Sequence, residues 1–72
     1  MNRKKPLFQY KRNLAQSYFP EILPESAVRR LDRWITNCKD LSSELQRVGY
    51  MKRQRIITQR QLHLIYAYLG EP

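Results

Sequence analysis

The side chains best suited to bind another molecule lie on one face of segment 24–38. Apolar residues recur there at intervals of three and four, as on one side of an amphipathic helix: Ala27, Leu31, Trp34, Ile35 and Cys38. The other side is polar and basic: Ser26, Arg29, Arg30, Arg33 and Asn37. Arginine on guanine and asparagine on adenine are common contacts in the major groove of DNA. The pattern favours a helix that anchors on a core and offers Arg29, Arg30, Arg33 and Asn37 to DNA. A merely solvated face is the alternative.

The arginines of this segment differ in their acidic neighbours. Arg29 has Glu25 four residues before it and Asp32 three residues after it, so pairing within the helix is expected to occupy it. Arg30 and Arg33 have no acid at either helical spacing. Neighbouring arginines repel one another, and contact with a phosphate or a base edge would relieve this repulsion. Arg30 and Arg33 are therefore the leading candidates for contact with DNA, and Asn37 ranks after them.

Charge supplies the strongest signal of the whole composition. Fourteen Lys and Arg stand against six Asp and Glu, which gives a net charge of +8. The excess is concentrated in residues 1–12 and 47–60, and neither stretch contains an acid. Two local basic patches favour a polyanionic partner, nucleic acid first, over a solubility surface or an acidic membrane.

A second candidate contact lies in the segment 52–55. Its cations are Lys52, Arg53 and Arg55, and no periodicity would bury them. Placed before a short strand, such a segment is typical of a wing that grips the DNA backbone, and an ordinary exposed hairpin is the alternative. The basic stretch 3–5 would suit a minor groove as a flexible arm, although a solvated tail explains it more simply.

Several other classes of function are disfavoured. Cys38 is the only cysteine and His63 the only histidine, so a disulfide, a zinc site and a catalytic centre are not expected. The sequence shows no glycine-rich phosphate loop, no paired catalytic carboxylates, no secretory signal and no membrane span. We expect a cytoplasmic protein that is not an enzyme and that has no cofactor, no metal and no small-molecule substrate.

The residues between these sites predict the elements that position them. Apolar spacing and helix-end signals predict four helices, at about 11–18, 24–37, 39–48 and 59–69. Thr58 and Gln61 have the spacing of a capping box, and Gly49 and Gly70 end the helices before them. Segment 50–57 reads as a loop entering a short strand, which would pair with residues 7–10. We expect one domain over 1–72, with a basic arm at 1–7 and a core at 8–72.

A dispersed set of residues carries a family resemblance: Tyr10-Lys11, Leu14-Ala15, Tyr18-Phe19-Pro20, Ser26-Ala27, Leu31, Trp34-Ile35, Leu41, Leu45, Gly49-Tyr50, Thr58, Gln61, Ile65 and Leu69-Gly70-Glu71-Pro72. On these residues the chain resembles a family of short Bacteroidetes proteins classed as a domain of unknown function, over about residues 8–72. The resemblance implies a bacterial, cytoplasmic, stand-alone protein and supplies no activity. The chain departs from the family pattern at Asn13, where Glu is frequent, and at Gln59, where Pro is frequent.

The layout is also similar, more distantly, to winged helices of the excisionase and mercury-resistance-regulator type. This similarity implies that the second helix reads the major groove and that a basic wing holds phosphates. The fold expected is therefore mainly α, a small helix-turn-helix domain of about four helices, with a short two-stranded wing. The expected function is DNA binding, as a transcriptional regulator or a recombination accessory factor. The expected partners are double-stranded DNA and a protein partner or second copy, and no membrane. A protein–protein adaptor with a basic surface is the alternative.

Overall fold

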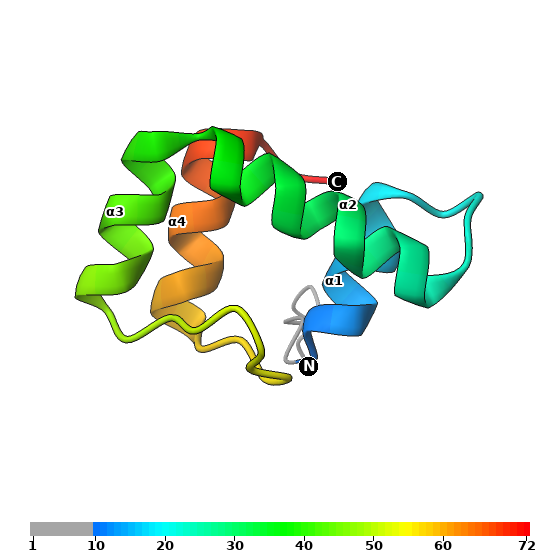
Figure 1. The fold of residues 1–72 in the computed structure, drawn as a ribbon, viewed down its shortest axis with the longest axis horizontal. Coiled ribbons are helices and arrows are strands. Elements are labelled where there is room, and N and C mark those ends of the chain that lie inside the picture. The colour runs from blue at the N-terminus through cyan, green and yellow to red at the C-terminus, as the bar shows by residue number, and fades with distance from the viewer. Residues whose placement is uncertain (1–9) are drawn as a thin grey trace, which may run out of the picture.

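Four helices follow one another in the computed structural model, which describes residues 10–72 (Figure 1). They are α1 (Lys11–Tyr18), α2 (Pro24–Asn37), α3 (Lys39–Arg47) and α4 (Gln59–Leu69). Each helix packs on the next, and α3 lies beside α4 at the end of the molecule away from α1 (Figure 1). The prediction of a mainly helical chain with four helices is confirmed. The predicted basic arm at 1–7 lies outside the described residues.

Local signals explain where the helices begin and end. Pro24 occupies the first turn of α2, where its missing N–H removes no hydrogen bond. The Thr58 hydroxyl accepts from the Gln61 backbone, and the Gln61 side chain accepts from the Thr58 backbone, so the predicted capping box opens α4. Gly49 and Gly70 follow α3 and α4 with φ near +80°, a backbone conformation that costs glycine little.

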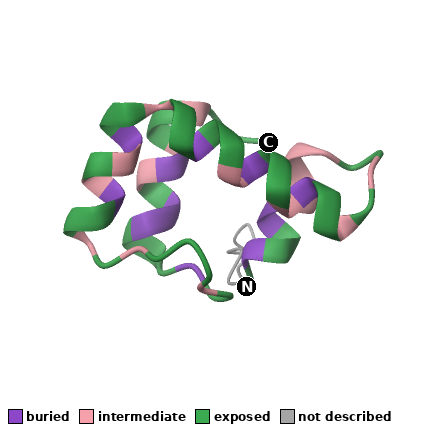
Figure 2. Ribbon diagram, viewed as in Figure 1, coloured by how far each residue is buried: buried purple, intermediate pink, exposed green. Residues whose placement is uncertain are grey.

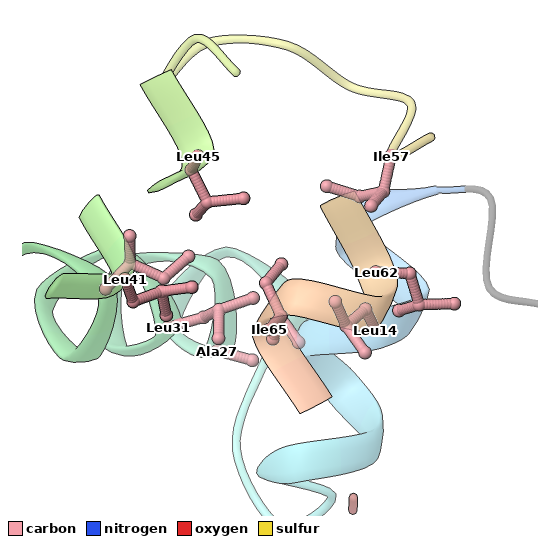
Figure 3. Close-up of a cluster of buried hydrophobic side chains, with 10 residues drawn as sticks. Leu14, Ala27, Leu31, Leu41, Leu45, Ile57, Leu62 and Ile65 are labelled. Atoms are coloured by element: carbon pink, nitrogen blue, oxygen red, sulfur yellow. The ribbon is translucent and has the colours of Figure 1, made fainter. Parts of the chain in front are cut away.

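Apolar side chains from all four helices meet in one core (Figure 3). Its buried members are Leu14, Ala15, Ala27, Leu31, Ile35, Leu41, Leu45, Ile57, Leu62 and Ile65. The sequence pattern placed Trp34 with them, but its side chain is 40% exposed. The reason is angular: Ala27, Leu31 and Ile35 define the buried stripe of α2, and Trp34 projects from the edge of that stripe.

The segment between α3 and α4 is a loop throughout and does not lead into the predicted short strand. Residues 7–9 of the predicted partner strand lie outside the described residues. Within residues 10–72 the loop's pairing with the N-terminal segment is a single antiparallel bridge between Tyr10 and Ile56. The Gln54 N–H donates to the Met51 carbonyl, which closes a tight turn around residues 52–53. We call residues 50–57 the basic loop. It is exposed along most of its length (Figure 2).

Candidate nucleic-acid interface

A groove of about 930 Å³ lies between the start of α1, the first half of α2 and the basic loop. Six of its lining residues are cations: Lys11, Arg12, Arg29, Lys52, Arg53 and Arg55. Glu25 is the one acid among the lining residues, and Tyr10 and Asn13 add an aromatic ring and an amide. The groove therefore has the electrostatic character of an anion-binding surface.

Lys11 holds the three walls of this groove together. Its side chain is almost fully buried, and its Nζ lies 2.5 Å from Oδ1 of Asp32 on α2. The same ammonium donates to the Lys52 carbonyl at 2.7 Å and lies 5.3 Å from the centre of the Tyr50 ring. In addition, the Lys11 backbone N–H donates to the Arg55 carbonyl at 2.7 Å. The start of α1 is thus bound at once to α2 and to two points of the basic loop.

Tyr50 forms the inner side of this anchor. Its ring is half-buried beneath the Lys11 ammonium. Burial raises the pKa of Tyr50 above its ordinary value, and the positive charge of Lys11 partly opposes that shift. The side chain therefore stays neutral at physiological pH, with its ring facing the Lys11 ammonium.

Two glutamines fix the remainder of the basic loop. The buried Gln61 side chain accepts from Nε2 of Gln54 at 2.6 Å and donates to the Val48 carbonyl at 3.1 Å. Gln54 in turn accepts from the Met51 N–H at 2.8 Å and donates to the Ile56 carbonyl at 2.7 Å. Because backbone groups of the loop are satisfied by side chains, the loop keeps one path without belonging to a sheet.

The structure divides the predicted site residues into two groups. Arg29, Lys52, Arg53 and Arg55 line the same groove. The other three, Arg30, Arg33 and Asn37, are exposed on α2 and do not line it.

The expected pairing of Arg29 within its helix is wrong. Asp32 pairs with Lys11 instead, and within residues 10–72 Arg29 forms no ion pair with Glu25. Conversely, Arg30 has a neighbour that the acid count missed, because its guanidinium lies 5.5 Å from the centre of the Phe19 ring. Arg29 is therefore the arginine of α2 that joins the cations of the basic loop.

Four lining residues at the start of α1 were not among the candidate contacts predicted from the sequence: Tyr10, Lys11, Arg12 and Asn13. The available signal was the basic stretch 1–12, which the charge pattern assigns to a polyanionic partner without singling out these residues. The sequence does not show that the neighbouring residues Lys11 and Arg12 differ in burial. Lys11 turns into the protein, whereas Arg12 stays exposed at the groove.

The described residues offer little support for other kinds of site. Residues 10–72 contain no group of three His, Cys, Asp or Glu side chains able to hold a metal ion. None of the helices α1–α4 has the length and apolar character of a membrane span. Cys38, the free thiol, is half-buried at the junction of α2 and α3.

Comparison with known proteins identifies the family. A family model described as Domain of unknown function (DUF4248) matches residues 7–72, nearly the whole chain, and the chain belongs to this family. Searches of curated proteins and of solved structures found no match.

Proposed function

We propose that this member of a family without an assigned function is a small DNA-binding protein whose groove holds the phosphate backbone. The observation that carries the proposal is the convergence of Arg29 from α2 with the three cations of the basic loop on one groove. Such clustering of like charge is unfavourable in water, and bound phosphates would relieve it. Backbone contacts of this kind set register and affinity without reading sequence.

The charge balance of the groove supports an anionic partner. Asp32 already neutralises Lys11, so that lysine serves the fold. The groove cations that remain are Arg12, Arg29, Lys52, Arg53 and Arg55, and all are exposed. Within residues 10–72 none of these five forms an ion pair. Because the loop path is fixed by Lys11, Gln54 and Gln61, little ordering of the loop would be needed on binding.

The helix-turn-helix interpretation adds recognition of the DNA sequence by α2. In it, α1 and α2 form the two helices, the basic loop takes the place of the wing, and α2 enters the major groove. Arg30, Arg33 and Asn37 would then reach base edges while the groove beside them holds a phosphate strand. A transcriptional regulator and a recombination accessory factor both fit this arrangement.

Salt dependence tests the backbone contacts. Each neutralised phosphate contributes about 0.9 to the slope of log Kd against log salt, so five groove cations give a slope of about 4 to 5. Fluorescence anisotropy of a labelled duplex across a salt series measures that slope. Arg53→Glu should weaken binding and reduce the slope by more than 1, because it removes a contact and adds repulsion.

A matched charge reversal controls this experiment. Arg47 lies on α3, pairs with Glu44 at 3.7 Å and does not line the groove. Arg47→Glu changes the net charge as much as Arg53→Glu does, and it should have the smaller effect. Equal effects of the two reversals, or no salt-dependent binding at all, would show that the groove is not a DNA site.

Recognition of the DNA sequence by α2 has a separate test. Selection from a duplex library at moderate salt should enrich a sequence motif with the unaltered protein. The double change Arg30→Ala and Arg33→Ala should remove that motif while leaving salt-dependent binding in place. If the unaltered protein enriches nothing, sequence reading by α2 is wrong and the backbone contacts stand on the salt experiment alone.

A further inference from the structure

Tyr10 is an exposed aromatic side chain at the edge of the groove. Its side chain is 54% exposed, and it lines the groove beside Arg12. Tyr18, Tyr50 and Tyr66, by contrast, pack partly against the core. Within residues 10–72 no other aromatic ring stacks on Tyr10. Such a ring, beside a row of cations, is available to a ligand.

The Tyr10 backbone is held in place. It forms the antiparallel bridge with Ile56, and the next residue, Lys11, donates to the Arg55 carbonyl at 2.7 Å. Paired residues in an antiparallel bridge project their side chains to the same side, so Ile56 flanks the Tyr10 ring. Ile56 is itself 57% exposed. Together they form a small apolar surface whose backbone is held by this bridge and hydrogen bond, next to the cations of the groove.

Cations along a groove and an aromatic ring at its edge are the two components of single-strand nucleic acid sites. The cations follow the phosphates, and the ring stacks on an unpaired base. In a fully paired duplex both faces of each internal base are already covered by neighbouring pairs, so that ring would find no base. A duplex therefore leaves Tyr10 and Ile56 unused.

We propose that the groove prefers DNA with an unpaired base, which stacks on the Tyr10 ring while its flanking phosphates contact Arg12, Arg29 and Arg55. This inference rests on the proposed DNA binding and specifies the form of DNA that the groove takes. Gapped DNA and melted recombination intermediates have that form. The preference arises from stacking, so it does not depend on which base is unpaired.

Three labelled probes of related sequence test the preference: a short duplex, the same duplex with a short central gap, and the single strand across the gap. Anisotropy at one salt concentration should show tighter binding to the two probes with unpaired bases. Tyr10→Ala should weaken binding to those two by about 5- to 150-fold and should weaken duplex binding far less, because a duplex offers the ring no unpaired base. Tyr10→Phe keeps the ring and should retain the preference.

Tyr68 provides the matched control. It is a tyrosine of α4 that is 43% exposed and does not line the groove, so Tyr68→Ala should leave all three affinities unchanged. Circular dichroism verifies that each variant folds. Bromouracil placed in the gap should photo-crosslink to Tyr10.

The outcomes separate the two proposals. If the unaltered protein binds duplex and gapped DNA equally, or if Tyr10→Ala keeps the preference for gaps, the stacking site is wrong and DNA binding through phosphates stands. If none of the probes binds in a salt-dependent manner, both proposals fail.

Discussion

The two sides of α2 hold the chain together by different chemistry. On one side, Asp32 binds the buried Lys11 ammonium, and through it the basic loop. On the other side, Trp34 packs edge-on against Phe19, with ring centres 4.7 Å apart. We call the first the ionic side and the second the aromatic side, which also includes Tyr18 at 5.9 Å from Trp34. The ionic side positions the groove, and the aromatic side joins α2 to the end of α1.

This difference explains why adjacent arginines have different surroundings. Arg29 lies on the ionic side and lines the groove with the loop cations. Arg30, one residue later, lies on the aromatic side over the Phe19 ring. The two share a residue type and nearly the same sequence context. Their surroundings are set by which part of the chain packs beside each of them.

Removing the carboxylate of the ionic side should have the largest effect. Asp32→Ala leaves the nearly buried Lys11 ammonium without its counter-charge, which we expect to cost about 3 kcal/mol of unfolding free energy. Urea unfolding followed by circular dichroism measures the loss. Glu44→Ala is the control, because the Glu44–Arg47 pair is largely exposed and contributes less than about 1 kcal/mol. Similar losses in the two variants would show that Lys11 is not anchored by its charge.

Truncating the aromatic side should have the next largest effect. Trp34→Ala removes the contacts with Phe19 and Tyr18, and because the ring is 40% exposed we expect a loss of about 2 kcal/mol. Thermal unfolding followed by circular dichroism measures it. The folded variant should keep its affinity for DNA of arbitrary sequence, since the groove belongs to the ionic side. A parallel loss of affinity would contradict the division of α2 into two sides.

The neighbouring arginines give a direct comparison of the two sides in binding. Arg29→Ala should weaken the binding of a duplex of arbitrary sequence by about tenfold, as expected when a charge-assisted phosphate contact is lost. Arg30→Ala should change that affinity by less than about threefold, since Arg30 does not line the groove. Anisotropy titrations at one salt concentration distinguish the two variants. The reverse order would assign phosphate binding to the aromatic side.

The smallest expected effect is on the stability of the protein at alkaline pH, through Tyr18 of the aromatic side. Burial, and then Tyr66 and Glu71, raise the pKa of Tyr18 from 10.0 to about 12, and its hydroxyl donates to the Gly70 carbonyl. The unfolded chain therefore loses this proton first, so stability falls as the pH rises from 10.0 through about 12. Tyr18→Phe should make that fall shallower in urea unfolding across this range. An unchanged slope would show that Tyr18 does not titrate differently in the folded chain.

The helices were predictable because their signals are local. Pro24 opens α2, and Thr58 with Gln61 opens α4, as their spacing indicates. The loop cations Lys52 and Arg53 were also recognisable as an exposed pair, since nothing in their spacing suggested burial. Each of these features is determined by a few residues that are close together in the sequence.

The anchor and the groove were not predictable because their causes are long-range. Lys11 reads as one more surface cation, and its burial depends on Asp32 in the next helix and on Lys52 far along the chain. The same contact removes Asp32 from Arg29, so the acid that the sequence assigned to Arg29 is held by another helix. Counting charges at helical spacing fails when another element takes the acid. The short strand predicted at the end of segment 50–57 is absent for a similar reason, because the Gln54 side chain, held by Gln61 of α4, satisfies backbone groups of the loop instead.

The hydrogen bond from Lys11 to the basic loop affects which amino acids the loop can tolerate. Its acceptor at position 52 is the main-chain carbonyl, which every amino acid possesses. The side chains at 52 and 53 can therefore be exchanged while the loop keeps its course, provided that Lys11 and Asp32 stay. The contact that fixes the course of the loop is thus separate from the side chains that the loop displays. That separation makes the loop tip a suitable position at which to vary the surface charge of this small scaffold without altering its fold.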